Sequence, residues 1–172
     1  MRNIIKRKKI FDGRLLKLCL ERERLPNGHI VDLEVIRHPG AVLIVPILNR
    51  EKVIMLKQYR PVINSEIWEL PAGTLKKNEK PLVCAKRELV EETGFSAMKW
   101  KRLGFIYPAP GYTTEKITIY EARSIKKVEP KLQADEIIEP HILSKKAVRK
   151  LLKGGGIIDA KTICALALGG VI

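Results

Sequence analysis

The chain has 172 residues, enough for one domain of ordinary size, and 45% of them are hydrophobic, which supplies a core and excludes a disordered chain. Its formal charge of +14 indicates contact with phosphate, whether on a nucleic acid, a membrane surface or a small anionic substrate. No stretch approaches the roughly 18 apolar residues of a membrane span, and the N-terminus lacks the apolar region of a signal peptide, so we expect a soluble cytoplasmic protein.

The first part of the chain predicts a small antiparallel sheet. Residues 14–22 alternate apolar and polar side chains, which is the pattern of a half-buried strand, and Asn27-Gly28 predicts a tight hairpin. Residues 4–10 and 29–36 are the expected neighbouring strands. Such a thin sheet cannot bury both faces by itself, so it must pack on something else.

Buried strands follow. Residues 41–48 and 53–56 are almost continuously apolar, as buried strands are, and residues 117–122 and 137–143 predict two more. Strands dominate the chain and helices interrupt them late, which is typical of an α+β or mixed α/β domain.

Helices are predicted from the signals at their ends. Asn78 is expected to cap a helix over about residues 79–93, with Pro81 in its first turn and Gly94 at its C-terminal end. Two shorter helices are expected further along the chain. Their end signals are Ser144, Gly154 and Asp159.

The first of these helices carries a cluster of carboxylates. Glu88, Glu91 and Glu92 are spaced i, i+3 and i+4, so they share one face of the helix. Like charges repel one another, so such a face is stable if it is solvated or if it binds cations, and hard oxygen ligands select Mg²⁺, Mn²⁺ or Ca²⁺. Taken alone, the triplet is more often a solvated acidic stripe.

The wider pattern decides between these interpretations, because it resembles the complete Nudix box. Gly73 is followed after five residues by Glu79, and after seven more by the run 87–95, RELVEETGF. Its seven fixed identities would agree by chance on the order of once in 10⁸ starting points. The resemblance implies the Nudix fold, an α+β protein built as an α/β/α sandwich, here with a small N-terminal antiparallel β-sheet.

The resemblance also implies roles for the box residues. Glu88 and Glu92 would be the principal metal ligands, with Glu91 a further ligand or a catalytic partner that holds water. The expected ion is Mg²⁺, with Mn²⁺ as the alternative; it would offset charge on a pyrophosphate and orient a water for attack. The positions with mainly structural roles are Gly73, Glu79, Arg87 and Gly94.

Two segments before the box resemble the ADP-ribose pyrophosphatase branch of this family: residues 58–60, QYR, and residues 68–73, WELPAG. The resemblance implies that Arg60 contacts substrate phosphate and that the carbonyl of Ala72 adds a metal ligand. Trp68 is a candidate to border the adenine. A planar guanidinium suits phosphate, although a surface ion pair for Arg60 and a core position for Trp68 stay open.

A third segment of the same kind is the stretch 108–116, which we expect to be irregular. Pro110 follows Gly94 by 16 positions, an offset that marks the branch, and Glu115 comes soon after. The resemblance implies that both lie at the substrate, with Glu115 coordinating metal or fixing the loop. A simple Pro-Gly turn is the alternative.

The candidate general base follows a second irregular stretch, residues 124–135. The branch keeps a carboxylate in the loop before its last strand, and the resemblance therefore implies that Glu136 deprotonates the attacking water. Asp135 could hold this role instead, and a solvated loop acid is the alternative for both.

The resemblance covers nearly the whole chain and implies its organisation. Residues 1–38 would be a dimerisation element and residues 39–172 the Nudix domain. In the branch, the N-terminal sheet builds a homodimer in which one subunit completes the substrate pocket of the other. Arg37, at the end of this sheet, is therefore expected to face the substrate, whereas the neighbouring His38 is more often structural.

The expected function is metal-dependent hydrolysis of the pyrophosphate of ADP-ribose, to AMP and ribose 5-phosphate, or of a related nucleoside diphosphate sugar. The nearest alternative is another Nudix activity, on a GDP-sugar, a dinucleoside polyphosphate or a nucleoside triphosphate. A non-catalytic RNA-binding Nudix domain is the alternative from a different class. Because every box carboxylate is present and the sequence lacks the aromatic-with-basic strand signature of an RNA-recognition sheet, we expect no nucleic-acid partner. Because no apolar span is present, we expect no membrane partner.

Overall fold

The computed structural model describes residues 3–129 and 137–172. By their contacts, the residues form two compact units: residues 1–40 together with 107–116, and residues 41–106 together with 117–172. The sequence did not predict that the stretch 107–116 would join the N-terminal unit.

The first unit is the expected antiparallel sheet, in the order β1-β2-β3, with β1 over Asn3–Asp12, β2 over Lys17–Arg24 and β3 over Ile30–Arg37. The predicted hairpin joins β2 and β3, and Gly28 adopts the left-handed φ of 88° that the turn requires. The stretch 107–116 lies along the edge of β3, because the amide of Ile36 donates to the carbonyl of Tyr112 at 2.8 Å.

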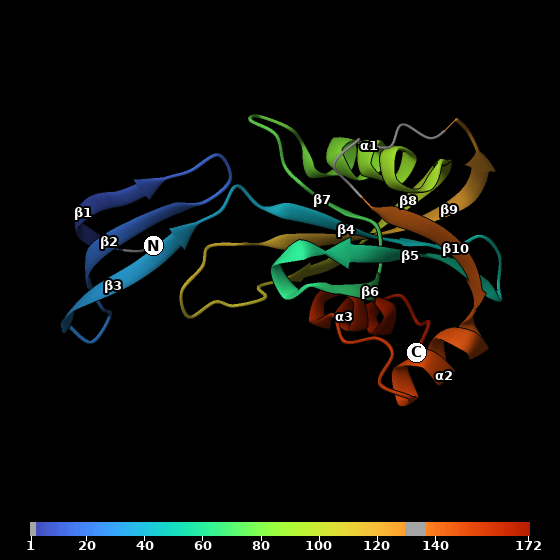
Figure 1. Cartoon of the computed structure of the whole chain (residues 1–172). Coiled ribbons are helices and arrows are strands. Elements are labelled where there is room, and N and C mark those ends of the chain that lie inside the picture. Colours follow the sequence, from blue (N-terminus) through green and yellow to red (C-terminus); the bar gives the residue numbers. More distant parts are fainter. Residues whose placement is uncertain (1–2, 130–136) are drawn as a thin grey trace. The chain divides into compact units, whose positions relative to one another are not determined.

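The second unit contains two sheets, one mixed and one antiparallel (Figure 1). A four-stranded sheet has the order β7-β4-β9-β8, in which only the β4–β9 pairing is parallel, and a three-stranded sheet has the order β10-β5-β6. The strands of the first sheet are β4 (Ala41–Pro46), β7 (Ala72–Thr74), β8 (Phe95–Ile106) and β9 (Ile117–Lys127). Those of the second are β5 (Lys52–Arg60), β6 (Ser65–Glu69) and β10 (Ile138–Ser144), with a 3-10 turn, η1, over Pro61–Ile63.

Helices cover both sides of these sheets, as the α/β/α sandwich requires. Figure 1 shows α1 (Pro81–Thr93) on one side, and α2 (Lys145–Lys153) and α3 (Ala160–Leu168) on the other. Every residue of β4 is buried, because Val42 and Ile44 pack in a cluster with α1 while Leu43 and Val45 pack in the larger core with α3. Burial on both faces explains the continuous apolar run in the sequence.

Several local expectations were wrong. Asn78 does not cap the first helix: it has a left-handed φ of 62°, and the cap position is Lys80, which makes no side-chain cap bond. The helix begins at Pro81, whose ring keeps the preceding residue extended and whose missing N–H needs no cap. The stretch 124–135 is not irregular throughout, since β9 continues to Lys127.

The other expected helix ends are confirmed. Gly94 ends α1 with a left-handed φ of 68°. Ser144 accepts a bond from the amide of Ala147 at 3.1 Å, and Asp159 accepts one from the amide of Thr162 at 3.0 Å. None of the helices in the described residues is long and apolar enough to cross a membrane.

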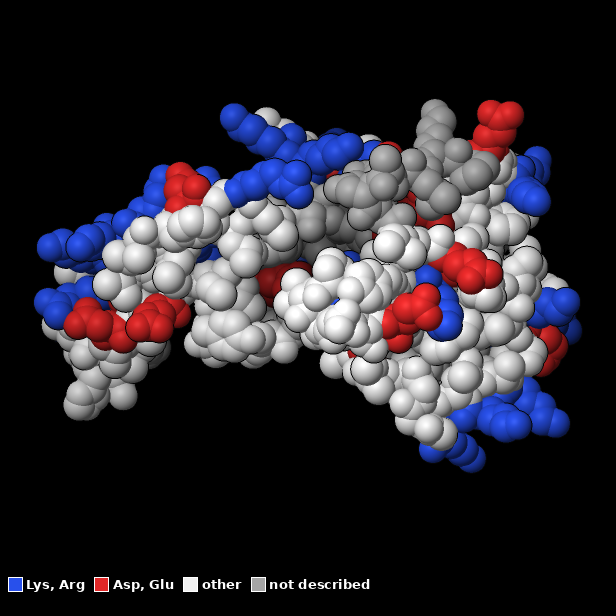
Figure 2. All heavy atoms as spheres, in the orientation of Figure 1, with Lys and Arg blue, Asp and Glu red and all other residues white. Residues whose placement is uncertain are grey.

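Helix α2 carries part of the large positive charge. Its basic side chains at i, i+3, i+4 and i+7 form one exposed stripe, while Val148 on the opposite side is fully buried. Figure 2 shows blue side chains gathered over this helix. The stripe consists of Lys146, Arg149, Lys150 and Lys153.

Candidate active site

The carboxylates of the box lie on α1 where it packs against β7. Glu88 is 6% exposed and Glu92 is 4% exposed, so this face is not a solvated acidic stripe. A Cβ atom added at Gly73 would stand 2.0 Å from Cδ and Oε1 of Glu88. The glycine that opens the box therefore leaves the space in which the Glu88 carboxylate lies.

Glu92 is held by the backbone of the same strand. The amide of Ala72 donates to Oε2 of Glu92 at 2.9 Å. Two neighbouring residues of β7 therefore contact the two carboxylates: Ala72 contacts Glu92, and Gly73 contacts Glu88. A metal bond from the carbonyl of Ala72 stays a prediction.

Arg87 stands at the centre of the charged cluster. Its Nη1 donates to Glu88 at 2.6 Å and to Glu91 at 2.8 Å, while Nε and Nη2 donate to the two oxygens of Glu79 at 3.0 Å each. These carboxylates raise the pKa of Arg87, with the hydrogen bond to Glu79 as the largest cause. The cluster therefore contains its own counter-charge.

Glu79 joins this cluster to the loop before α1. The hydrogen bond from Arg87 lowers the pKa of Glu79 from 4.5 to about 2, and its side chain is only 10% exposed. Its Oε2 also accepts from the amide of Lys76 at 2.9 Å. These contacts are of the structural kind that the box resemblance implies for Glu79.

We expect Glu79→Gln to lower the free energy of unfolding at pH 7 by about 1–3 kcal/mol, because a charge-assisted pair is lost. A depressed carboxylate pKa contributes stability above pH 4.5 that is lost as the pH falls toward about 2, so the difference from wild type should shrink over that window. Urea unfolding at several pH values measures this. The exposed Glu66→Gln is the control, and an undiminished difference at pH 2 would contradict the assignment.

Cys84 lies beside the cluster as a buried thiol. It is 0% exposed, and burial, together with the charge of Glu88, raises its pKa to about 12. Its sulfur lies 3.6 Å from the carbonyl oxygen of Thr74. A thiol that stays protonated is a packing group here and not a nucleophile.

The donor chemistry of this face fits a divalent cation. Glu88, Glu91 and Glu92 offer hard oxygen ligands at the spacing of adjacent helical turns. In the described part of the chain, no three His, Cys, Asp or Glu side chains already converge on one point, and Arg87 binds two of the carboxylates. An ion would therefore be bound in exchange for part of these bonds.

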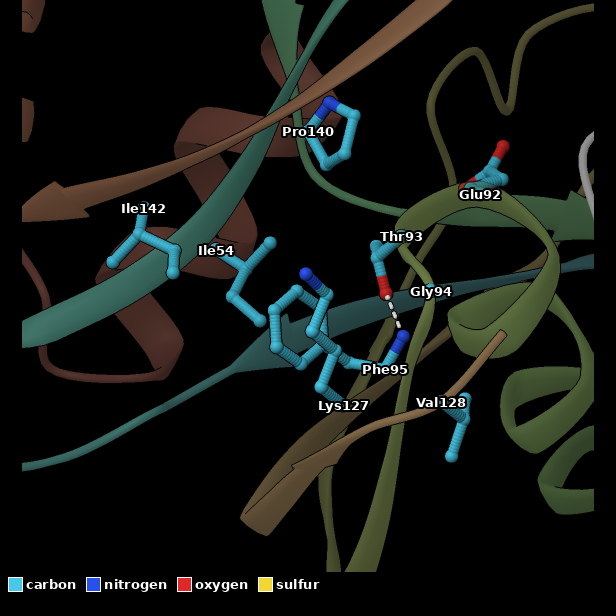
Figure 3. A pocket seen from close by; sticks show the side chains of 9 residues that line it. All are labelled: Ile54, Glu92, Thr93, Gly94, Phe95, Lys127, Val128, Pro140 and Ile142. Atoms are coloured by element: carbon cyan, nitrogen blue, oxygen red, sulfur yellow. Dashed lines mark hydrogen bonds between the residues drawn. The ribbon is translucent and has the colours of Figure 1, made fainter. Parts of the chain in front are cut away.

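A cavity of about 330 Å³ opens beside the C-terminal end of α1 (Figure 3). Glu92 is among its lining residues, and the amide of Phe95 donates to the hydroxyl of Thr93 at 3.1 Å within it. The sequence did not predict this hollow, because it lies between strands that are distant along the chain. The other lining residues are Ile54, Gly94, Lys127, Val128, Pro140 and Ile142.

Arg60 forms the ion pair that the sequence left open. Its Nε donates to Oε2 of Glu69 at 2.6 Å. Burial opposes the charge of Arg60, but the hydrogen bond to Glu69 and the nearby negative charges outweigh this effect and raise its pKa. Glu69 is 1% exposed, whereas the Arg60 side chain is 39% exposed. The ion pair does not test whether Arg60 also contacts substrate phosphate, so this contact stays a prediction.

Trp68 packs as a core residue. It is partly buried against the larger core, and its ring meets that of His141 edge to face at a centroid distance of 5.0 Å. This is the structural role that the sequence left open, and a contact with adenine stays a prediction.

Arg37 belongs to the first unit, where it binds a buried carboxylate. Its Nη2 donates to the two oxygens of Glu21 at 2.6 and 2.8 Å, and Arg7 also donates to Glu21 at 2.6 Å. Glu21 is 0% exposed, and although burial opposes its ionisation, these hydrogen bonds lower its pKa. Sequence reasoning missed Glu21, but the period of two places it on the same face as the buried Cys19.

Pro110 and Glu115 also belong to the first unit. Pro110 lines a shallow hollow there together with Glu23 and Tyr112. The amide of Glu115 donates to the hydroxyl of Thr113 at 3.1 Å, and its carboxylate lies 3.9 Å from Nε2 of His38. These contacts agree with a loop-fixing role. Glu136 and Asp135, the candidate bases, lie outside the described residues.

The fold and the box together define a protein of the Nudix class, in which a helix between strands presents clustered glutamates. A family model described as NUDIX domain matches residues 37–166, and the chain belongs to this family. Family members typically need a divalent metal for hydrolysis.

Individual relatives match almost the whole chain. It is 38% identical to the methanol dehydrogenase activator of Bacillus methanolicus and 36% identical to the ADP-ribose pyrophosphatase of Bacillus subtilis, each over 94% of this chain and 89% of the relative. The ADP-ribose pyrophosphatase of Mycobacterium tuberculosis is 33% identical, over 93% of this chain and 76% of that protein. The crystal structure of an ADP compounds hydrolase shares the fold, with a TM-score of 0.82 and 24% identity over 97% of this chain and 91% of that one.

Proposed function

We propose that this protein hydrolyses the pyrophosphate bond of ADP-ribose, or of a related nucleoside diphosphate sugar, and releases AMP and ribose 5-phosphate from ADP-ribose. The observation that carries the chemistry is the pair of buried carboxylates, Glu88 and Glu92, set against Gly73 and Ala72. The names of the relatives from Bacillus subtilis and Mycobacterium tuberculosis support the choice of substrate.

In this proposal Glu88, Glu92 and Glu91 hold Mg²⁺, with Mn²⁺ as a substitute and the carbonyl of Ala72 as a further ligand. The bound cation supplies charge compensation for the pyrophosphate and orients the attacking water. Arg60 directs its guanidinium to a phosphate, where parallel N–H groups match the phosphate oxygens.

Glu136 accepts the proton of the attacking water in this mechanism. We expect Glu136→Gln to lower kcat by about a hundredfold or more, because the base is lost, while Mg²⁺ still binds. Turnover assays with calorimetric titration of Mg²⁺ test this, with Asp135→Asn as the matched variant. Normal turnover in Glu136→Gln, together with a loss in Asp135→Asn, would move the role to Asp135.

We also propose a homodimer formed through the N-terminal sheet, with Arg37, Pro110 and Glu115 serving a substrate pocket. Large apolar side chains of this sheet are exposed, among them Phe11 at 61% and Leu20 at 42%. Such a surface is commonly covered by a partner. A monomeric mass in light scattering would contradict the dimer.

The free cysteines support a reducing, cytoplasmic location.

A substrate panel tests the proposal. Purified protein with Mg²⁺ is incubated with ADP-ribose, GDP-mannose, diadenosine polyphosphate, NADH and capped RNA, and we expect ADP-ribose to give the highest kcat/KM. Equal rates on every compound, or no reaction with ADP-ribose, would exclude the proposed specificity.

A second candidate function is activation of a dehydrogenase, which is favoured by the 38% identity to the methanol dehydrogenase activator. It is compatible with hydrolysis, because an activator can act through the reaction it catalyses. Methanol dehydrogenase assayed with and without this protein distinguishes the two, and an unchanged rate would dismiss this candidate.

A further inference from the structure

A buried carboxylate at the end of β6 joins two cations. Glu69 is 1% exposed; its Oε2 accepts the bond from Nε of Arg60 at 2.6 Å, and its Oε1 accepts a bond from Nζ of Lys161. Lys161 also donates to Oδ1 of Asp159 at 2.8 Å. A carboxylate removed from water is costly unless it is paired, and here each of its oxygens has a charged partner.

The segment that carries Glu69 is anchored on both sides. Asp159 caps α3 through its other oxygen, and the hydroxyl of Thr162 in α3 accepts a buried bond from the amide of Leu70 at 3.0 Å. Two residues further on, Ala72 donates to Glu92. The position of the Glu69 carboxylate is therefore fixed with respect to α3 and to the box helix.

Arg60 is held by this carboxylate through one nitrogen atom. The exposed pairs Arg22–Asp32 and Arg123–Glu121 are bidentate, since Nε and Nη2 each bind one carboxylate oxygen. Arg60 binds Glu69 through Nε alone, and within the described residues its two Nη groups donate to no side chain. Because 39% of the Arg60 side chain is exposed, we infer that these Nη groups are available to bind a ligand.

We propose that Glu69 is a positioning residue, which aims the Nη edge of Arg60 at the diphosphate of the substrate, with Lys161 balancing its second oxygen. This inference rests on the proposed function, because it assigns Arg60 to the diphosphate. A guanidinium fixed at Nε loses less rotational freedom when its Nη edge binds phosphate, so the carboxylate strengthens binding without touching the substrate.

The variant Glu69→Gln tests the proposal, because it keeps the size of the side chain but removes the charge. We expect it to raise KM for ADP-ribose about tenfold while kcat changes less than about threefold, and to have no further effect in Arg60→Ala. The matched control is Glu66→Gln on the same strand, whose exposed partner is Lys57 at 2.8 Å, and its KM should not change. Unchanged KM in Glu69→Gln, or effects that add in the double variant, would overturn the proposal.

Two further measurements distinguish a loss of positioning from a failure to fold and from an error in the proposed substrate. Glu69→Asp keeps the charge but draws Arg60 back by about 1.5 Å, so it should raise KM even if Glu69→Gln fails to fold. Calorimetry with inorganic pyrophosphate needs no turnover. If Glu69→Asp binds pyrophosphate as tightly as the wild type does, the positioning role is wrong. If the wild type does not hydrolyse ADP-ribose but Glu69→Asp binds pyrophosphate about tenfold more weakly than the wild type, only the proposed substrate is wrong.

Discussion

Glu92→Gln should lower kcat for ADP-ribose on the order of a thousandfold, because a neutral amide is a poor ligand for a hard divalent cation. The amide oxygen can still accept the bond from Ala72, which is 2.9 Å long in the wild type, so the fold should be kept. Steady-state kinetics and calorimetric titration of Mg²⁺ measure the two effects.

The control for this experiment is Glu139→Gln, since Glu139 has an exposed side chain on β10. It should retain wild-type turnover. Full activity in Glu92→Gln would show that the buried face of α1 is not the metal site, and a collapse of the melting temperature would show that its role is structural.

Gly73→Ala is the second large effect expected, because a methyl group would stand 2.0 Å from the carboxylate of Glu88. The side chain of Glu88 must move, and a displacement of about 1 Å at a catalytic ligand can cost on the order of a hundredfold in rate. The free energy of unfolding should change less than in Leu43→Ala, which empties a fully buried core position and typically costs about 2–5 kcal/mol.

Gly154→Ala is the matched glycine control, because its nearest neighbouring atom would be 3.4 Å from the new Cβ. It should affect neither turnover nor Mg²⁺ affinity. If Gly73→Ala binds Mg²⁺ and turns over like wild type, Glu88 does not need the space that the glycine leaves.

The parts of the fold that local sequence determines were predicted well. The period of two identified the N-terminal strands, and the side chains of Ser144 and Asp159 identified the starts of α2 and α3. The error at Asn78 arose because a residue type common at caps was weighed above the restraint that Pro81 places on its neighbour. Strand β8 was missed because its long, mixed sequence has no clean alternation, and it is defined by its pairing with β9.

Contacts across long sequence separations could not be predicted. Glu69 and Lys161 are 92 residues apart, so nothing in their local sequence indicates that they meet. Glu88 and Glu92 were predicted from spacing and resemblance, but their burial depends on where β7 passes over α1. The sequence therefore predicted the carboxylates Glu88 and Glu92, whereas the residues that contact them could be identified only from the fold.

The bonds of Arg87 bear on what happens when the metal is removed. Since this guanidinium binds three carboxylates, Glu79, Glu88 and Glu91 keep a positive partner when no metal is bound. We therefore expect removal of the metal by a chelator to leave these carboxylates paired with Arg87, a cation that is covalently part of the chain. We expect the protein to stay folded after chelation and to regain activity when a divalent cation is added back.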